Sequence, residues 1–256
     1  MRTFLKILVS AAVIGVLFAG SAKASEPGDL GVRLSTGIEY SSGTYGGEED
    51  IEELYVPVTM RLDQGRWALR LTVPYVRVSE TASMPTESGL GDVIAGVTMY
   101  DVYVNKHSDF FVDLTGRVKF GTADEEKGLG TVENDYTIQA SAYKYLSYVT
   151  LQGMAGDRFR GEPEGYSLND VVLASFGGVF GPAPATSLGL FYDFRESALA
   201  NADDIHEVSG FVSRRFNDSW RMEFYVFTGF GDSSADWGGG LLVTTDLREL
   251  RISDRD

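Results

Sequence analysis

Thirteen charged side chains alternate with apolar residues along the sequence, and they form its largest set of residues suited to chemistry. They carry both signs and are rich in arginine: Arg33, Glu39, Arg61, Arg70, Asp113, Arg117, Lys119, Asp193, Arg195, Glu207, Arg215, Arg221 and Glu223. Charges of both signs on one enclosed face can pair with one another or line a path that selects among ions. We therefore expect these residues to line the lumen of a barrel. That lumen either conducts or is filled by a paired network.

Two histidines lie near serines, which is the first requirement for a serine hydrolase. His107 directly precedes Ser108 in a predicted short turn, with Asp109 as its nearest acidic neighbour, and His206 lies three residues before Ser209. A nucleophilic serine needs a base within hydrogen-bond reach, whereas residues three apart on a strand point to opposite faces. We predict no catalytic residue and do not expect an enzyme.

Acidic residues gather in two predicted loops, between Glu48 and Glu53 and between Asp124 and Glu126. Calcium and magnesium prefer several carboxylate oxygens, so these loops are candidates for weak cation binding that bridges to lipopolysaccharide phosphates. Their spacing lacks the D-x-D-x-D-G pattern of a calcium loop, which favours solvated loops instead. The chain has no cysteine and only two histidines. We predict no metal site and no cofactor.

The elements that must position the charges are strands with a period of two. In the run from Leu54 to Leu62, for example, apolar residues alternate with Tyr55, Pro57, Thr59 and Arg61. Twelve strands are predicted in total, at 30–40, 54–62, 67–75, 92–104, 110–120, 135–146, 148–159, 170–180, 187–195, 206–216, 220–230 and 237–246. Bacterial membrane barrels have an even number of strands. A tilted strand of about ten residues spans the hydrocarbon layer.

The predicted connections also alternate in length. Short links at 63–66, 105–108, near 147, 181–186 and 217–219 separate longer polar links at 42–53, 77–91, 121–134, 160–169, 196–205 and 231–236. Outer-membrane barrels place short turns at one rim and long loops at the other. This order favours a barrel over a soluble sandwich.

Periodicity alone cannot orient a barrel, because a lipocalin-like soluble barrel has its apolar face inside. Two features favour a membrane barrel: the charged composition of the polar face, and aromatic residues near strand ends on the apolar face, where an interfacial girdle belongs. These are Trp67, Tyr75, Phe110, Phe120, Trp220 and Phe230. The predicted fold is all-β, a transmembrane antiparallel up-and-down β-barrel of about 12 strands, with a soluble barrel or sandwich as the alternative.

The first residues have the order of an export signal. Two basic residues precede a mostly apolar stretch, Ile7 to Ala19, and Ala22-Lys23-Ala24 matches the A-x-A site of signal peptidase. A membrane anchor needs about 20 apolar residues, more than this stretch supplies. We expect residues 1–24 to be a cleaved signal peptide and residues 25–256 to form one barrel domain in the cell outer membrane.

The chain is acidic, with 37 Asp and Glu against 22 Lys and Arg and a net charge of −15. Such a chain is a poor partner for nucleic acid, whose phosphates attract cations. Its expected partners are outer-membrane lipid and lipopolysaccharide, the barrel-assembly machinery and small-molecule cargo.

Residues 89 to about 160 resemble the outer-membrane barrel family named for the meta-pathway of phenol degradation. The matching motifs are Gly89-Leu90-Gly91-Asp92, Phe120 to Asp124, Lys127 to Thr131, and Asp135-Tyr136. The chain has Gly121 where that family has proline and Val132 where glycine is usual. The resemblance implies a barrel that transports hydrophobic or aromatic small molecules. The predicted function is a channel or facilitator for such uptake, and the alternative is a non-conducting structural or surface-interaction barrel.

Overall fold

The computed structural model describes residues 29–79, 85–163, 165 and 167–251. The predicted signal peptide lies outside the described residues. The strands are β1 (Asp29–Gly43), β2 (Ile51–Gln64), β3 (Trp67–Val78), β4 (Glu87–Leu90), β5 (Val93–Asn105), β6 (Phe110–Phe120), β7 (Asp135–Tyr145), β8 (Val149–Phe159), β9 (Val171–Ala183), β10 (Thr186–Arg195), β11 (Ile205–Arg215), β12 (Trp220–Phe230) and β13 (Trp237–Arg251). Among the described residues, no helix is long and apolar enough to cross a bilayer.

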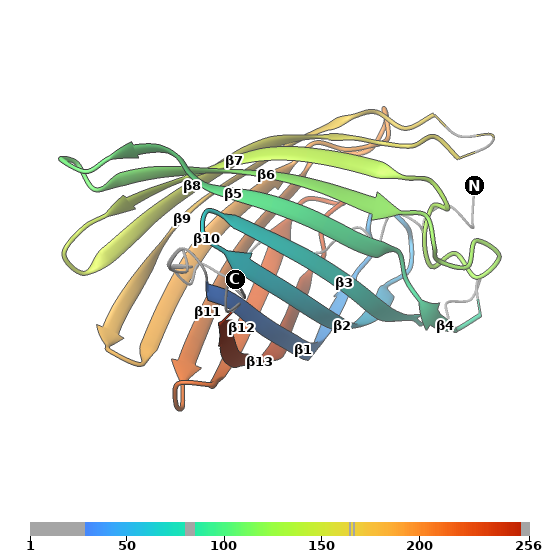
Figure 1. Cartoon of the computed structure of the whole chain (residues 1–256). Helices are drawn as coiled ribbons and strands as arrows, with labels where there is room; N and C mark the ends of the chain where they lie inside the picture. Colours follow the sequence, from blue (N-terminus) through green and yellow to red (C-terminus); the bar gives the residue numbers. More distant parts are fainter. Residues whose placement is uncertain (1–28, 80–84, 164, 166, 252–256) are drawn as a thin grey trace.

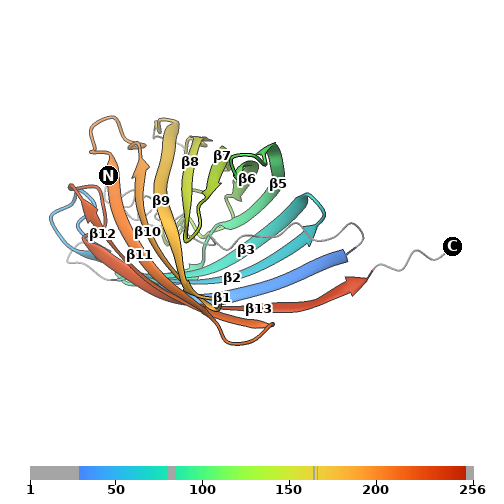
Figure 2. The same ribbon diagram turned by 90° about the vertical axis from the view of Figure 1, so that its left-hand side faces the viewer.

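The strands form a closed barrel of twelve antiparallel strands with one extra strand. Each wall strand pairs with its sequence neighbours, and the first strand, β1, pairs with the last, β13, which closes the wall. β3 pairs with β5 along one half and with the short β4 along the other. Figures 1 and 2 show the tilted strands curving round a common interior. The predicted fold class is confirmed; β4 was not predicted and lies within the predicted link 77–91.

The two rims differ as the link lengths predict. Residues 65–66, 106–109, 146–148, 184–185 and 216–219 form short connections at one rim, called here the turn rim. The long connections 44–50, 121–134, 196–204 and 231–236 lie at the other, the loop rim, toward the right in Figure 1, together with the described parts of the links between β3 and β5 and between β8 and β9. The turn between β2 and β3 has two residues, and Gly65 adopts there a left-handed φ of 55° that glycine tolerates without strain.

The barrel has its polar face inside and its apolar face outside. On β1, Glu39 is 8% exposed while its neighbour Ile38 is 49% exposed. On β3, Leu71 is 39% exposed while Thr72 is buried. A soluble protein would bury the leucine and expose the polar residues. The arrangement therefore fits a barrel whose outer face meets lipid.

The predicted aromatic residues lie on this outer face. Trp67, Tyr75, Phe120, Trp220 and Phe230 are 40–54% exposed, and Phe110 is half-buried beside Tyr103. Trp67, Phe110 and Trp220 lie next to the turn rim, and the other three lie toward the loop rim. Two bands of aromatic side chains at membrane–water boundaries are typical of outer-membrane barrels.

The exposed first loop provides a direct test of orientation. Glu48, Glu49 and Asp50 are exposed at the loop rim. An epitope inserted after Glu49 is expected to be tolerated and to bind antibody on intact cells, because long loops of these barrels face outward. An epitope in the turn at residues 217–218 is the matched control and should require permeabilised cells. Labelling of the second epitope but not the first on intact cells would invert the assigned orientation.

Candidate functional site: a charged lumen and the loop at its mouth

The strand register places all thirteen predicted lumen residues on the inner face. Their cross-strand neighbours are Arg33 with Arg61, Arg61 with Arg70, Asp113 with Ser141, Arg117 with Thr137, Lys119 with Asp135, Asp193 with Glu207, Arg195 with Ile205, Arg215 with Arg221, Glu223 with Ser213 and Glu39 with Tyr55. Residues directly opposite on paired strands share a face. The thirteen residues therefore lie on the face of the wall that points into the barrel, and their role in a lumen stays a prediction.

Near the turn rim the lumen is lined by ion pairs and hydroxyl groups. Arg33 Nε donates to Asp246 Oδ1 at 2.7 Å, and Arg61 Nε donates to Asp63 at 3.0 Å. Hydroxyl pairs join neighbouring strands at 2.9–3.0 Å: Ser35 with Thr244, Thr59 with Thr72 and Thr98 with Thr115. Neither aspartate was among the predicted lumen residues, although each continues the alternation of its strand by one further step. This half of the interior is lined by polar and charged side chains.

Toward the loop rim, one side of the interior is aromatic. Phe191, Phe211, Tyr225, Phe227, Ala235 and Leu242 form a buried cluster on β10 to β13 and the loop between β12 and β13. The Phe191 and Phe211 rings stack with centroids 6.2 Å apart. The Tyr225 hydroxyl donates to Glu39. The sequence placed Tyr225 on the polar face of its strand, but it did not predict the inward cluster of rings.

Glycines on the neighbouring strands make room for these rings. Phe191 lies opposite Gly177, Phe211 opposite Gly189 and Phe227 opposite Gly238. A Cβ atom at Gly189 would lie 2.1 Å from Phe211, and one at Gly238 would lie 2.2 Å from Phe227. A real Cβ cannot approach so closely, so each ring lies directly over a glycine backbone. This pairing is the sequence signal that would have revealed the cluster.

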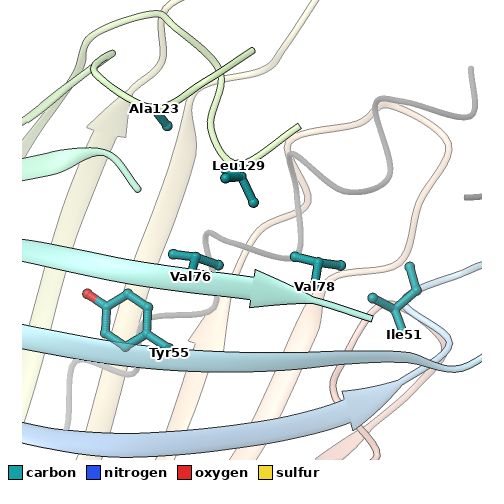
Figure 3. Close-up of a cluster of buried hydrophobic side chains, with 6 residues drawn as sticks. All are labelled: Ile51, Tyr55, Val76, Val78, Ala123 and Leu129. Atoms are coloured by element: carbon teal, nitrogen blue, oxygen red, sulfur yellow. The ribbon is translucent and has the colours of Figure 1, made fainter. Parts of the chain in front are cut away.

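The loop between β6 and β7, residues 121–134, folds over the mouth of the barrel; it is called here the inner loop. Leu129, 1% exposed, packs with Ala123 against Ile51, Val76 and Val78. Figure 3 shows the two loop residues facing the side chains of β2 and β3. Burial of a leucine stabilises by about 1.5–3 kcal/mol. Residues 128–131 and Ala123 are therefore buried against the barrel wall, whereas the acidic residues 124–126 of the same loop are exposed.

Asp92 holds the inner loop in place. Its Oδ1 accepts the backbone N–H groups of Thr122 and Ala123, both at 3.0 Å. Its Oδ2 accepts Lys119 Nζ at 3.0 Å. Lys119 Nζ also donates to Thr131 Oγ1 at 2.6 Å and lies 3.5 Å from Asp135. Lys119, expected to line the lumen, thus serves chiefly as an anchor for the loop.

The two motifs of the family resemblance meet at this anchor. Gly130 lies beside Asp92, and a Cβ there would be 2.6 Å from Asp92 Oδ1. Gly89 lies beside Leu129, and a Cβ there would be 2.9 Å from its side chain. Val132, at the position where glycine is usual, adopts a left-handed φ of 60°. The motifs therefore encode the infolded loop.

Tyr45 connects the two sides of the mouth. Its ring packs against both the cluster under the inner loop and the aromatic cluster. Its hydroxyl donates to Ser41 Oγ at 3.1 Å. Burial raises the pKa of Tyr45 above its usual value, so the hydroxyl stays protonated. The first loop therefore also contributes to the narrowing of the mouth.

The other chemistry candidates are not brought together. His206 lies on the outer face, with Nδ1 2.7 Å from the Tyr192 hydroxyl, while Ser209 is buried on the inner face. In the described ranges, no group of three or more His, Asp and Glu residues is placed to hold a metal ion. Glu53, predicted in the first acidic loop, is instead a buried inward residue of β2. Its register opposite Ser41 and Val78 explains this correction.

Solved outer-membrane barrels share this architecture. An outer membrane channel from Pseudomonas putida F1 superposes with a TM-score of 0.74 at 13% identity, over 90% of this chain and 100% of that chain. The KdgM porin superposes with a TM-score of 0.56 at 9% identity, over 84% of this chain and 99% of that chain. The translocator domain of the autotransporter NalP from Neisseria meningitidis gives 0.50 at 10% identity, over 88% and 90%. At these identities the likeness shows the fold.

No protein-family model matches the sequence, and no curated protein matches it. The resemblance to the meta-pathway family therefore remains a prediction from the quoted motifs.

Proposed function

We propose that the protein is an outer-membrane channel for the uptake of small molecules, exported by its signal peptide and inserted by the barrel-assembly machinery. The carrying observation is the inside-out barrel: a lipid-compatible outer face encloses an interior lined by arginines, hydroxyl groups and carboxylates. Two of the similar solved structures are described as a channel and a porin. Lumenal charges of this kind select among solutes in water-filled barrels.

The cargo we propose is small and apolar or aromatic in part. Its support is the aromatic cluster around Phe191, Phe211 and Phe227, which places rings on the inner face near the loop rim, where a solute from outside would enter. The resemblance to the meta-pathway barrels implies the same class of cargo. Apolar side chains with a few polar groups are the usual lining of small-molecule sites.

The uptake of a fluorescent apolar probe tests this function. Intact cells that express the chain should accumulate N-phenyl-1-naphthylamine faster than cells that express an unrelated closed barrel at equal abundance. Phe211→Ser should reduce the difference if the variant retains its heat-dependent shift in gel mobility. Equal rates for cells with and without the folded chain would contradict the proposed cargo.

The alternative function is a non-conducting barrel whose lumen is closed by side chains and infolded loops. The packing of Leu129 and Tyr45 at the mouth is the observation in its favour. Conductance of the Asp92→Ala variant, described in the Discussion, separates a closed barrel from a channel that the inner loop narrows.

A further inference from the structure

We propose that an arginine track through the lumen conducts anions, so that the solutes of this channel are small organic carboxylates with an apolar body. This inference rests on the proposed channel function and specifies its substrate class. The track consists of Arg33, Arg61, Arg70, Arg117, Arg158, Arg160 and Arg195.

The register brings the first members of the track side by side. Arg33 lies directly opposite Arg61, and Arg61 lies directly opposite Arg70. Gly96 follows opposite Arg70, with Arg117 on its other side. The Arg117 side chain lies close over this glycine, since a Cβ at Gly96 would be 3.1 Å from Arg117 Cγ. Arg33 and Arg61 also pair with Asp246 and Asp63, so the positive charge of the row is partly balanced at the turn rim. Like charges directly opposite on a sheet destabilise it, so their repetition along one row indicates an anion-binding function.

The row continues to the loop rim. Arg117 lies opposite Thr137 on β7, which lies opposite Arg158 on β8. Arg195, Arg160 and Arg117 lie near enough for their charges to act on Arg158, as does the opposite charge of Asp135. Arg33 lies near the turn-rim end of β1, whereas Arg158 is the next-to-last residue of β8 at the loop rim. A row of paired residues in a tilted barrel climbs along the axis, so the track spans the lumen from rim to rim.

The arginines are more accessible than the buried glutamates of the interior, although Asp113, Asp193 and Asp246 are partly exposed as well. All seven retain partial exposure. In contrast, Glu39, Glu53, Glu207 and Glu223 are only 5–8% exposed. A solute in the lumen therefore meets guanidinium groups before it meets these carboxylates, although the two signs are both abundant on the inner face.

Two members of the track each have a buried donor without a hydrogen-bond partner. Within the described part of the chain, the buried Nε atoms of Arg117 and Arg160 have no hydrogen-bond partner. Arg117 donates another N–H to the neutral amide oxygen of Gln139 and not to a carboxylate. An unsatisfied buried donor costs about 1–3 kcal/mol. A guanidinium fork matches the two oxygens of a carboxylate, so the accessible ends of these guanidinium groups are suited to bind a carboxylate in the lumen.

The wall across the lumen selects the body of the solute. Six members of the track lie on β1 to β3, on β6 and at the end of β8, whereas Arg195 ends β10. Phe191, Phe211, Phe227 and Leu242 lie on β10 to β13. Most of the track therefore lines one part of the interior, and the apolar rings line another, where Arg195 also lies. An aromatic or short aliphatic carboxylate complements both, whereas inorganic phosphate complements the track alone.

Reversal potentials across a planar bilayer test the track. Under a tenfold KCl gradient, protein purified from outer membranes should favour chloride over potassium, and it should pass benzoate better than phosphate when each replaces chloride. Arg70→Gln with Arg117→Gln should lower the chloride-to-potassium permeability ratio by about fivefold or more. The matched control removes two arginines from the outer face, Arg77→Gln with Arg214→Gln, and should leave the ratio unchanged.

Each outcome has a distinct meaning. Potassium preference, or an equal effect of the two double variants, would overturn the track while the channel stands. Better passage of phosphate than benzoate would overturn the apolar part of the substrate class. A complete absence of current from folded protein would overturn the proposed channel function and the track with it.

Discussion

Leu71→Arg is expected to prevent assembly of the barrel. Leu71 lies on the outer face of β3, 39% exposed, in the middle part of a strand that begins at the turn rim with Trp67. An arginine facing lipid at the bilayer midplane costs about 2–4 kcal/mol. We expect the variant to be depleted from the outer membrane and to lose the heat-dependent shift in gel mobility of a folded barrel.

Trp67→Arg provides the matched control for this prediction. Trp67 lies on the same strand and the same outer face, at the rim, where the cost of an arginine falls to about 0–1 kcal/mol. It should assemble far better than Leu71→Arg. Equal assembly of the two variants, or wild-type assembly of Leu71→Arg, would contradict the assignment of the lipid-facing surface.

Asp92→Ala is expected to release the inner loop and to raise conductance severalfold. The substitution removes the acceptor of the Thr122 and Ala123 backbone N–H groups and one of the two carboxylates near Lys119. The lost hydrogen bond from the part-buried Ala123 N–H and the lost ion pair with Lys119 together weaken the loop by about 1–3 kcal/mol, which is comparable to the gain from burying Leu129. Single-channel recordings should show larger steps and more frequent transitions than the wild type.

Glu126→Ala is the control for Asp92→Ala, because Glu126 lies in the inner loop and is exposed. It should leave the step size unchanged. A folded Asp92→Ala barrel with wild-type steps would show that the inner loop does not limit the pore. Silence from both the wild type and Asp92→Ala would favour the closed-barrel alternative.

Much of the wall was predictable because its signal is local. Period-two alternation in runs such as Leu54 to Leu62 located the twelve strands, and the charges on the alternate positions identified the inner face. The aromatic residues at strand ends, such as Trp67 and Trp220, were placed on the outer face by the same rule. The position of a strand, the face on which a residue lies and the rim at which a connection lies can each be predicted from a few consecutive residues.

The interior was less predictable because its contacts join distant segments. The inner loop depends on Asp92, on a backbone about thirty residues later at Thr122, and on the missing side chain of Gly130. The inward rings depend on a glycine at the paired position of the next strand, as with Phe211 and Gly189. Neither relation is visible until the register is known, so the loop was predicted as solvated and the rings were overlooked.

Single-channel conductance of the purified chain tests the central claim most directly. The protein would be taken from outer membranes, shown to be folded by its heat-dependent gel shift, and recorded in a planar bilayer. The channel account predicts discrete current steps that depend on this protein. Sustained silence from demonstrably folded protein would contradict it.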